Sequence, residues 1–256
     1  MNITSSRSRR AALAAVAFSL LGLLAPSALV AGEAITPSAP VQLFNGRDLA
    51  GWVVVGRDGD PAAKDTWSVR DGVLTATGSP YGYARTDRAY RDYVLRIEWR
   101  WMPGDAPLDA NGKPRGRNSG VLVHTQGEDK VWPSCLEAQL QEGNAGDFIA
   151  MAPAIVFGEL TAMRDKAVLA AGADEAARER ARTGRRLARQ HPSSEKPIGE
   201  WNTYEIVCRG DTVTLTVNGV LQNTATALTI TDGTIGLQSE GMPIEFRRVE
   251  LAPLGK

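Results

Sequence analysis

The stretch Tyr93-Val94-Leu95-Arg96-Ile97-Glu98-Trp99-Arg100-Trp101 decides the fold of this chain. Apolar and aromatic side chains occupy its first residue and every second residue after it, while the positions between them are mostly charged. Successive side chains of a β-strand point to opposite faces of the sheet. The stretch therefore predicts a long strand with one face in a hydrophobic core.

A tight hairpin is predicted on the N-terminal side of this strand. Trp67-Ser68-Val69-Arg70 and Val73-Leu74-Thr75-Ala76 flank Asp71-Gly72, and both turn residues tolerate positive φ. Further strands are expected within residues 118–124, 132–141, 204–209, 212–217, 234–240 and 244–251.

The last expected strand is irregular, because its apolar positions change parity between Phe246 and Val249. This change indicates a β-bulge or a strand that is buried on both faces. The whole set consists of short strands joined by turns rich in Gly, Asp and Pro. Such a pattern predicts an all-β sandwich of two antiparallel sheets, and not a parallel α/β sheet.

Residues 159–190 interrupt the strand pattern and are rich in Ala, Arg and Glu. They predict a helical and charged insertion between strands, which could cover one edge of a groove as a lid. Acidic residues are interleaved with its arginines, which favours a solvated helical face over an anion-binding site. The basic residues concerned are Arg178, Arg180, Arg182, Arg185, Arg186 and Arg189.

The N-terminal residues predict export. Three arginines within residues 7–10 precede an uncharged apolar run over residues 11–31 that contains Pro26. This pattern is typical of a secretory signal, and the Ser8-Arg9-Arg10 sequence approximates a twin-arginine signal. An uncleaved membrane anchor is the alternative, although Pro26 and the small residues near position 31 favour cleavage. We expect a signal peptide over residues 1–31, a linker over 32–40 and one domain over 41–254, in the periplasm or outside the cell.

The charge of the chain argues against a nucleic-acid partner. The 29 basic and 29 acidic residues give a net charge of 0, and loss of the signal with its arginines leaves about −3. We expect no membrane association once the signal is removed. Cys135 and Cys208, the two cysteines, could pair in an oxidising compartment, but both lie in expected strands. Two free buried thiols are therefore the preferred interpretation.

The segment Cys135-Leu136-Glu137-Ala138-Gln139-Leu140-Gln141 carries the candidate chemistry. Strand alternation turns Leu136 and Ala138 to the core and turns Glu137 and Gln139 to the opposite face. An ordinary wet sheet surface would show the same stripe of Glu and Gln. The neighbouring expected strands favour a site, because His124, Gln238 and Glu240 lie on their polar sides.

Two tryptophans, Trp132 and Trp201, lie close to these strands in the sequence. Aromatic rings can stack on the apolar face of a sugar ring, while amides and carboxylates bind the sugar hydroxyls. The combination therefore indicates a carbohydrate site.

An ordered series of motifs resembles the 3-keto-disaccharide hydrolase family over about residues 41–254. Any one of the motifs is weak, but their order is specific. They begin with Leu43-Phe44-Asn45-Gly46-Arg47-Asp48-Leu49-Ala50-Gly51-Trp52 and continue with Asn118-Ser119-Gly120-Val121, Glu137-Ala138-Gln139, Gly146-Asp147-Phe148, Gly199-Glu200-Trp201-Asn202, Ile235-Gly236-Leu237-Gln238-Ser239-Glu240-Gly241 and Ile244-Glu245-Phe246-Arg247. Residues 159–190 have no clear counterpart in that family.

The resemblance implies a concanavalin A-like jelly roll that acts on glycosides already oxidised at C3 by a separate sugar 3-dehydrogenase. Related glucanases carry two carboxylates on the strand that here carries Glu137 and Gln139. An ordinary retaining glycosidase needs such a pair, which an amide cannot complete. A 3-keto group removes that need, because the ketone acidifies the C2 proton and permits elimination of the C1 substituent followed by hydration.

We therefore expect Glu137 or His124 to be the base, and the other of the two, or Glu240, to protonate the leaving oxygen. Arg247, Gln139 or a divalent cation could polarise the ketone, although no ligand set for a metal is recognisable. The expected substrate-binding residues are Gln139, Trp132, Gln238, Asn118, Arg247 and Trp201. A non-catalytic carbohydrate-binding module is the main alternative, and a structural or protein-interaction sandwich is another.

Overall fold

The computed structural model describes residues 33–106, 108, 111–114 and 116–255. Residues 31–256 form one compact unit. The expected signal peptide lies outside the described residues and stays a prediction. Part of the expected linker pairs with the domain, because Ile35 forms a parallel bridge with Tyr90. No helix within the described ranges is long and apolar enough to cross a membrane.

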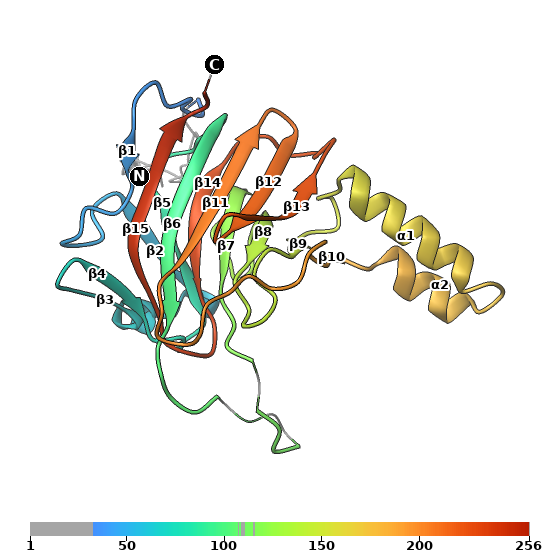
Figure 1. Cartoon of the computed structure of the whole chain (residues 1–256), viewed down its shortest axis with the longest axis horizontal. Helices are drawn as coiled ribbons and strands as arrows, with labels where there is room; N and C mark the ends of the chain where they lie inside the picture. The colour runs from blue at the N-terminus through green and yellow to red at the C-terminus, as the bar shows by residue number, and fades with distance from the viewer. Residues whose placement is uncertain (1–32, 107, 109–110, 115, 256) are drawn as a thin grey trace, which may run out of the picture. The chain divides into compact units, whose positions relative to one another are not determined.

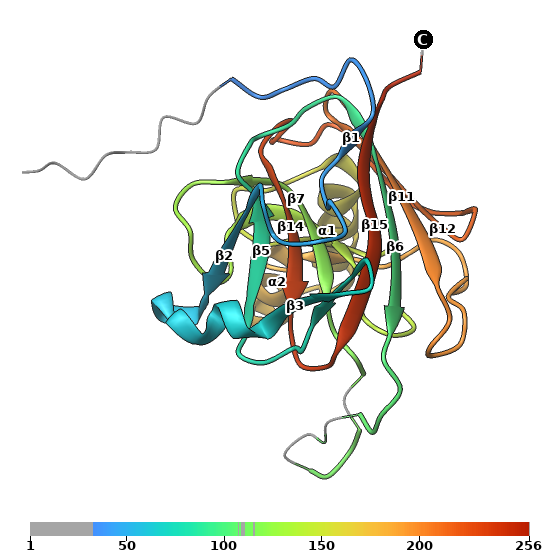
Figure 2. The same cartoon turned by 90° about the vertical axis from the view of Figure 1, so that its left-hand side faces the viewer.

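Two antiparallel sheets face each other and make up the body of the domain (Figure 2). The eight-stranded sheet has the order β13 (Val220–Ala225), β12 (Thr212–Val217), β11 (Asn202–Arg209), β6 (Tyr93–Trp101), β15 (Ile244–Pro253), β4 (Val73–Ala76) and β3 (Trp67–Arg70), with β1 (Val41–Gln42) also pairing with β15. The seven-stranded sheet has the order β10 (Arg186–Leu187), β9 (Phe148–Ala150), β8 (Ser134–Gln139), β7 (Gly120–Gln126), β14 (Thr234–Ser239), β5 (Gly82–Thr86) and β2 (Trp52–Gly56). The prediction of an all-β jelly-roll sandwich is confirmed.

The hydrophobic core lies between the sheets and follows the alternation of the sequence. In β6, the residues from Tyr93 to Trp101 alternate between buried and half-buried, and Trp99 is fully buried. Leu136 and Ala138 of β8 reach the same core from the seven-stranded sheet. Truncating a buried tryptophan such as Trp99 to alanine would cost about 3–5 kcal/mol, because a cavity replaces packed atoms.

The predicted turns and the predicted bulge are present. Asp71 and Gly72 have φ values of 51° and 78° between β3 and β4. The register of β15 against β6 shifts between Phe246 and Arg248, which is the bulge that the change of parity indicated. Several strands were not predicted, because their sequences lack clear alternation: β2, β5, β9, β10 and β13.

The insertion forms a helical hairpin of α1 (Gly158–Ala170) and α2 (Glu175–Arg182), followed by β10. The hairpin extends from the β9–β10 edge of the sandwich (Figure 1). The first turn of α1 still packs on the body, because Leu160 is buried in the core and Glu159 accepts hydrogen bonds from Thr226. Arg178 and Arg182 pair with Glu175 on the solvated surface of α2, as expected. Two short 3₁₀ segments, η1 (Arg57–Gly59) and η2 (Pro61–Thr66), follow β2.

Candidate functional site

The seven-stranded sheet turns one face to the core and the other face away from it, and we call the second the site face. Leu136 and Ala138 belong to the core, so their neighbours Glu137 and Gln139 lie on the site face. The predicted orientation of Glu137 relative to its own strand is therefore correct.

The Glu137 carboxyl is buried in a niche between two strands. The side chain is 3 % exposed, and its Oε1 atom has no hydrogen-bond partner. Leu122 of β7 and Ile149 of β9 are its cross-strand neighbours. The carboxyl lies over Gly120, where a Cβ atom would collide with Oε1. The absence of a side chain at position 120 thus creates the space that the acid occupies.

The surroundings of Glu137 favour its protonated form. Burial is the main cause that raises its pKa to about 8, and the Glu240 carboxylate raises it further, while Arg185 lowers it. The pKa of Glu240 is also raised by burial, against the opposing effects of Arg57, Arg185 and the Asn118 amide. Two coupled carboxyl groups with perturbed pKa values are typical of an acid–base site.

Three further polar atoms of the site face have no hydrogen-bond partner: Asn118 Oδ1, Gln238 Oε1 and Tyr83 Oη. Asn118 forms a β-bridge with Glu240, and Gln238 is the cross-strand partner of Tyr83. A buried polar group normally finds a partner, so a cluster of unpaired ones indicates space for a ligand or for water. The structure therefore brings Glu137, Glu240, Gln238 and Asn118 to one face, as expected.

Gln139 is on the site face, but its carbonyl is already engaged. Its Oε1 atom accepts hydrogen bonds from the backbone N–H groups of Leu140 and Gln141, both at 2.8 Å. Its amide carbonyl therefore caps the end of its own strand. Only the amide nitrogen remains to donate to a substrate.

Trp132 also contributes to the site face. It is half-buried and packs against a buried cluster of Val55, Tyr83, Leu122 and Cys135. Cys208 instead belongs to the core between the sheets, and both cysteines are free. The preferred interpretation of two unpaired buried thiols is confirmed.

His124 does not lie on the site face, and the prediction of a catalytic role for it is wrong. The pairing of β7 with β8 shifts register after Val123, and His124 adopts a positive φ of 55°. This bulge turns the imidazole into the core, where its centroid lies 6.1 Å from the Tyr93 ring and its Nδ1 lies 3.1 Å from the Ile230 carbonyl oxygen. Burial there lowers the pKa of His124 to about 4.

Trp201 and Arg247 lie on the outer face of the other sheet, so their predicted role in substrate binding is also wrong. Arg100 and Arg247 stack on the Trp201 ring, with guanidinium carbons 4.5 Å and 4.4 Å from its centroid. Arg247 also pairs with Glu98, which points out of β6 on the side opposite its core residues. Proximity in sequence could not show that these residues belong to the eight-stranded sheet.

An ion pair fixes a loop next to the site face. The Arg85 guanidinium of β5 binds both carboxylate oxygens of Asp129 at 2.6 Å and 2.8 Å. Asp129 and Val131 line a separate hollow of about 800 Å³ beside β2, together with Val55 and Lys64. Sequence reasoning missed Arg85 and Tyr83, because β5 shows no polar–apolar alternation that would have marked them.

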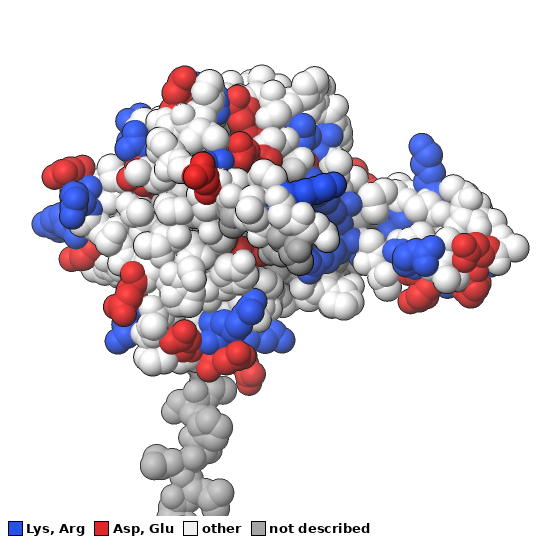
Figure 3. All heavy atoms as spheres, turned by 90° about the horizontal axis from the view of Figure 1, so that it is seen from below, with Lys and Arg blue, Asp and Glu red and all other residues white. Residues whose placement is uncertain are grey.

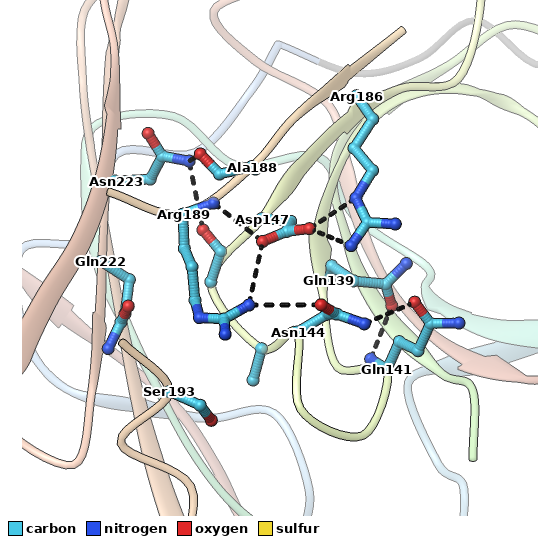
Figure 4. Close-up of polar contacts among 12 residues, drawn as sticks. Gln139, Gln141, Asn144, Asp147, Arg186, Ala188, Arg189, Ser193, Gln222 and Asn223 are labelled. Carbon is cyan, nitrogen blue, oxygen red and sulfur yellow. Dashed lines mark hydrogen bonds and ion pairs between the residues drawn. The ribbon is translucent and has the colours of Figure 1, made fainter. Parts of the chain in front are cut away.

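The strand after the helical hairpin is anchored to the sheet by a buried carboxylate (Figure 4). Asp147 is fully buried and accepts hydrogen bonds from Arg186 Nε at 2.6 Å and from the Arg189 backbone N–H at 2.8 Å. Asn144 accepts a further bond from Arg189 at 3.2 Å. These two arginines therefore do not belong to a solvated helical face, in contrast to the prediction. Lys and Arg side chains gather where the hairpin meets the body, whereas both signs are interspersed elsewhere on the face that Figure 3 shows.

Metal-ligating side chains do not cluster in the described part of the chain. Among these residues no group of three or more His, Cys, Asp or Glu could hold a metal ion. Glu137 and Glu240 are the acidic groups of the site, and the polar atoms around them come from amides and a phenol.

Comparison with known proteins identifies both the family and the fold. A family model described as 3-keto-alpha-glucoside-1,2-lyase-like domain matches residues 39–252. A search among curated proteins finds no match.

Solved structures with the same fold are distant in sequence. A candidate glycosyl hydrolase from Parabacteroides distasonis is 19% identical with a TM-score of 0.55, over 85% of this chain and 94% of that one. A structure described as a native glycosidic hydrolase has 12% identity and a TM-score of 0.53, over 87% and 99% of the two chains. The carbohydrate-binding module CBM66 from Bacillus subtilis has 11% identity and a TM-score of 0.51, over 78% and 94%. These likenesses show the fold, and the family match supports a carbohydrate-active function.

Proposed function

This chain belongs to the 3-keto-alpha-glucoside-1,2-lyase-like domain family, and we propose that it cleaves glycosides already oxidised to a ketone at C3. The observation that carries the proposal is the coupled pair of Glu137 and Glu240 on the site face, with the pKa of Glu137 raised to about 8. A ketone at C3 makes a single base sufficient to start the reaction, so the amide at position 139 is no obstacle.

The two carboxyl groups take different roles because they differ in burial. Glu137 is the more buried of the two and keeps its proton at neutral pH, so it is the general acid. Glu240 is half-buried, and its negative charge is one cause of the raised pKa of Glu137. It is therefore the carboxylate that acts as the base. This division follows the general rule that environments which push two pKa values apart separate acid from base.

In the first half of the reaction, Glu240 removes the proton from C2. The electrons of the C2–H bond form a C2=C3 double bond, and the ketone becomes an enolate with its negative charge on the C3 oxygen. The enolate then collapses, the C1–O bond breaks, and Glu137 gives its proton to the departing oxygen. The alcohol leaves, and a 2-hydroxy-3-keto-glycal remains.

In the second half, water adds to C1 of the glycal. Glu137, now ionised, takes a proton from the water, and charge returns to the C3 oxygen. Glu240 then gives back its proton at C2. Both carboxyl groups recover their starting states, and the net reaction is hydrolysis to a 3-keto sugar and an alcohol. General acid–base catalysis of this kind typically contributes about 10²–10⁴-fold to the rate.

Three further features belong to the proposal. An oxidoreductase that acts on C3 of glycosides, a sugar 3-dehydrogenase, supplies the substrate. The protein works in the periplasm or outside the cell after removal of its signal. The reaction as proposed routes no step through a divalent cation.

The test compares oxidised and unoxidised substrates. Purified protein is incubated with 3-keto-trehalose and 3-keto-lactose, and in parallel with trehalose and lactose, and free 3-keto-glucose or glucose is measured. We expect turnover of the keto substrates alone, and a loss of about 10²–10⁴-fold in the Glu137→Gln variant. Glu205→Gln is the matched control, since it makes the same change on the outer face of the eight-stranded sheet, where Glu205 pairs with Arg96.

Two results would contradict the proposal. Equal cleavage of oxidised and unoxidised glycosides would identify an ordinary glycosidase. Binding of the keto sugars without turnover would identify a carbohydrate-binding module.

A further inference from the structure

Tyr83 contributes a buried hydroxyl to the site face that donates to no acceptor among the residues that the structure describes. The residue lies in β5 between Val55 of β2 and Gln238 of β14, which are its cross-strand partners. Its side chain is fully buried, and the Lys130 backbone N–H lies near its oxygen, but its hydroxyl proton has no acceptor among the described residues. Leaving a buried donor unpaired destabilises the folded state, so an unpaired hydroxyl in this position requires an explanation.

The Tyr83 ring belongs to the same region as the catalytic carboxyl pair. It is part of a buried cluster with Leu122 of β7 and Cys135 of β8. Cys135 precedes Glu137 by two residues on the same strand, and Leu122 is the cross-strand partner of Glu137. The cluster therefore crosses the sheet from β5 to the strand that carries Glu137, whose carboxyl leans towards β7 over Gly120.

The proposed reaction needs a hydrogen-bond donor for the oxygen at C3. Negative charge develops on this oxygen twice, once when the C2 proton leaves and once when water adds to C1. A donor that is already positioned in a site of low polarity stabilises such charge most effectively. Neither Glu137 nor Glu240 can provide this bond while it transfers protons at C1 or C2.

Two cationic candidate donors are engaged elsewhere. Arg247 lies on the opposite sheet and pairs with Glu98. The Arg85 guanidinium is held by Asp129. Asn118 Oδ1 and Gln238 Oε1 are also unpaired on this face, but they are acceptors that suit sugar hydroxyls.

We propose that Tyr83 is a further catalytic residue of this protein, whose hydroxyl donates a hydrogen bond to the C3 oxygen of a bound 3-keto sugar and stabilises the enolate in both halves of the reaction. This inference rests on the proposed function. Burial raises the pKa of Tyr83, and the nearby Asp129 carboxylate raises it further, so the phenol stays protonated and acts as a donor without losing its proton.

The test uses Tyr83→Phe in the full chain and follows two rates. One is kcat for release of the alcohol, and the other is the rate at which deuterium from D₂O enters C2 of 3-keto-glucose. The second rate reports enolate formation without any leaving group. We expect both rates to fall by about 10²–10³-fold, with the factor unchanged across the pH range and KM within about threefold of wild type.

Tyr93→Phe is the matched control. It also removes one buried tyrosine hydroxyl, but from the core between the sheets, beside His124 and Cys208. We expect this variant to keep wild-type rates. Tyr83→Phe should fold normally, because removing an unpaired buried hydroxyl is neutral or stabilising, and its thermal midpoint checks this.

The outcomes separate the two proposals. The role of Tyr83 would be overturned if the kcat of Tyr83→Phe stayed within about threefold of wild type. The proposed function would still stand in that case, provided that wild type turns over and Glu137→Gln does not. A fall in kcat that Tyr93→Phe matches would also overturn it. Wild-type protein that neither cleaves keto substrates nor exchanges the C2 proton would overturn the proposed function, and the role of Tyr83 with it.

Discussion

The carboxyl group of Glu137 occupies the space that a side chain at Gly120 would fill. A Cβ atom built on Gly120 would meet Oε1, Cδ and Cγ of Glu137, all closer than real Cβ contacts occur. Gly120 itself pairs with Gln139, two residues further along the strand of Glu137. A missing side chain on one strand thus sets the position of the acid on the next.

Gly120→Ala should separate activity from stability. Gly120 does not have a positive φ, so its backbone conformation accepts alanine, and the atoms in conflict belong to the flexible end of Glu137. We expect a change in unfolding free energy of about 1 kcal/mol or less but a loss of 10-fold or more in kcat, because the carboxyl must move.

Urea unfolding and initial rates on a 3-keto disaccharide measure the two effects. Gly219→Ala lies in a turn with positive φ and open space around it, so it should lower stability and leave kcat unchanged. Full activity in Gly120→Ala would show that the position of the Glu137 carboxyl is not critical.

Activity should fall as the pH rises through about 8. The proposed general acid is Glu137, whose pKa is raised to about 8, and it can no longer donate a proton once it is ionised. On the acid side, activity should fall when Glu240 becomes protonated and loses its function as the base. Profiles of kcat/KM against pH check this, and Glu137→Gln should abolish the alkaline limb. An alkaline limb that persists in the variant would assign the acid to another group.

Burying the acid should also make stability depend on pH. The pKa of Glu137 is about 8 in the folded chain and 4.5 in an unfolded chain. The folded state is therefore not penalised by this group below pH 4.5, and the penalty grows as the pH rises from 4.5 to 8. Glu137→Gln should therefore raise the unfolding free energy by about 4–5 kcal/mol at pH 8–9 and by little near pH 4. Urea midpoints at both pH values measure the difference, and equal gains at both would contradict it.

His124 should destabilise the protein in acid. Burial lowers its pKa from 6.5 to about 4. Between pH 6.5 and pH 4, His124 is therefore protonated in the unfolded chain but neutral in the folded chain, which favours unfolding. We expect a loss of about 3 kcal/mol as the pH falls from 6.5 to 4, and no further loss from this residue below that.

His124→Asn should flatten this dependence, because asparagine tolerates the positive φ at this position and does not titrate. The variant should be less stable than wild type at pH 7, where it loses packing against Tyr93. His191→Asn, at an exposed position, serves as the control. If the unfolding free energies of wild type and His124→Asn change in parallel with pH, His124 is not the cause of the loss of stability in acid.

Asp147→Asn should loosen the strand that follows the helical hairpin. The fully buried carboxylate holds Arg186 and the backbone of Arg189, and both arginines retain some access to water. We expect a loss of about 1–3 kcal/mol, and faster hydrogen exchange at the amides of Arg189 and Ala150, the latter bonded to the Arg185 carbonyl.

Glu175→Gln is the control for Asp147→Asn, because it removes an exposed ion pair on α2. It should change the unfolding free energy by about 0.5 kcal/mol or less. Unchanged exchange at Arg189 and Ala150 in Asp147→Asn would mean that strand pairing alone anchors the segment.

The sequence by itself determined the sandwich class and the orientation of side chains along regular strands. Alternation in residues 93–101 predicts which side of β6 is buried, and alternation around Glu137 correctly turns this acid away from the core. The change of parity after Phe246 predicts the bulge of β15. These features are local, since a pleated strand exposes successive residues on opposite faces wherever it lies in the fold.

Only the tertiary structure decided which residues share the site. Alternation assigns a side to each residue of a strand, but it carries no information about strand order, so Trp201 and Arg247 could not be assigned to the other sheet. The bulge that turns His124 into the core arises from pairing between β7 and β8. The proximity of Glu240 and Tyr83 to Glu137 likewise depends on hydrogen bonds between strands far apart in the chain, which no local pattern encodes.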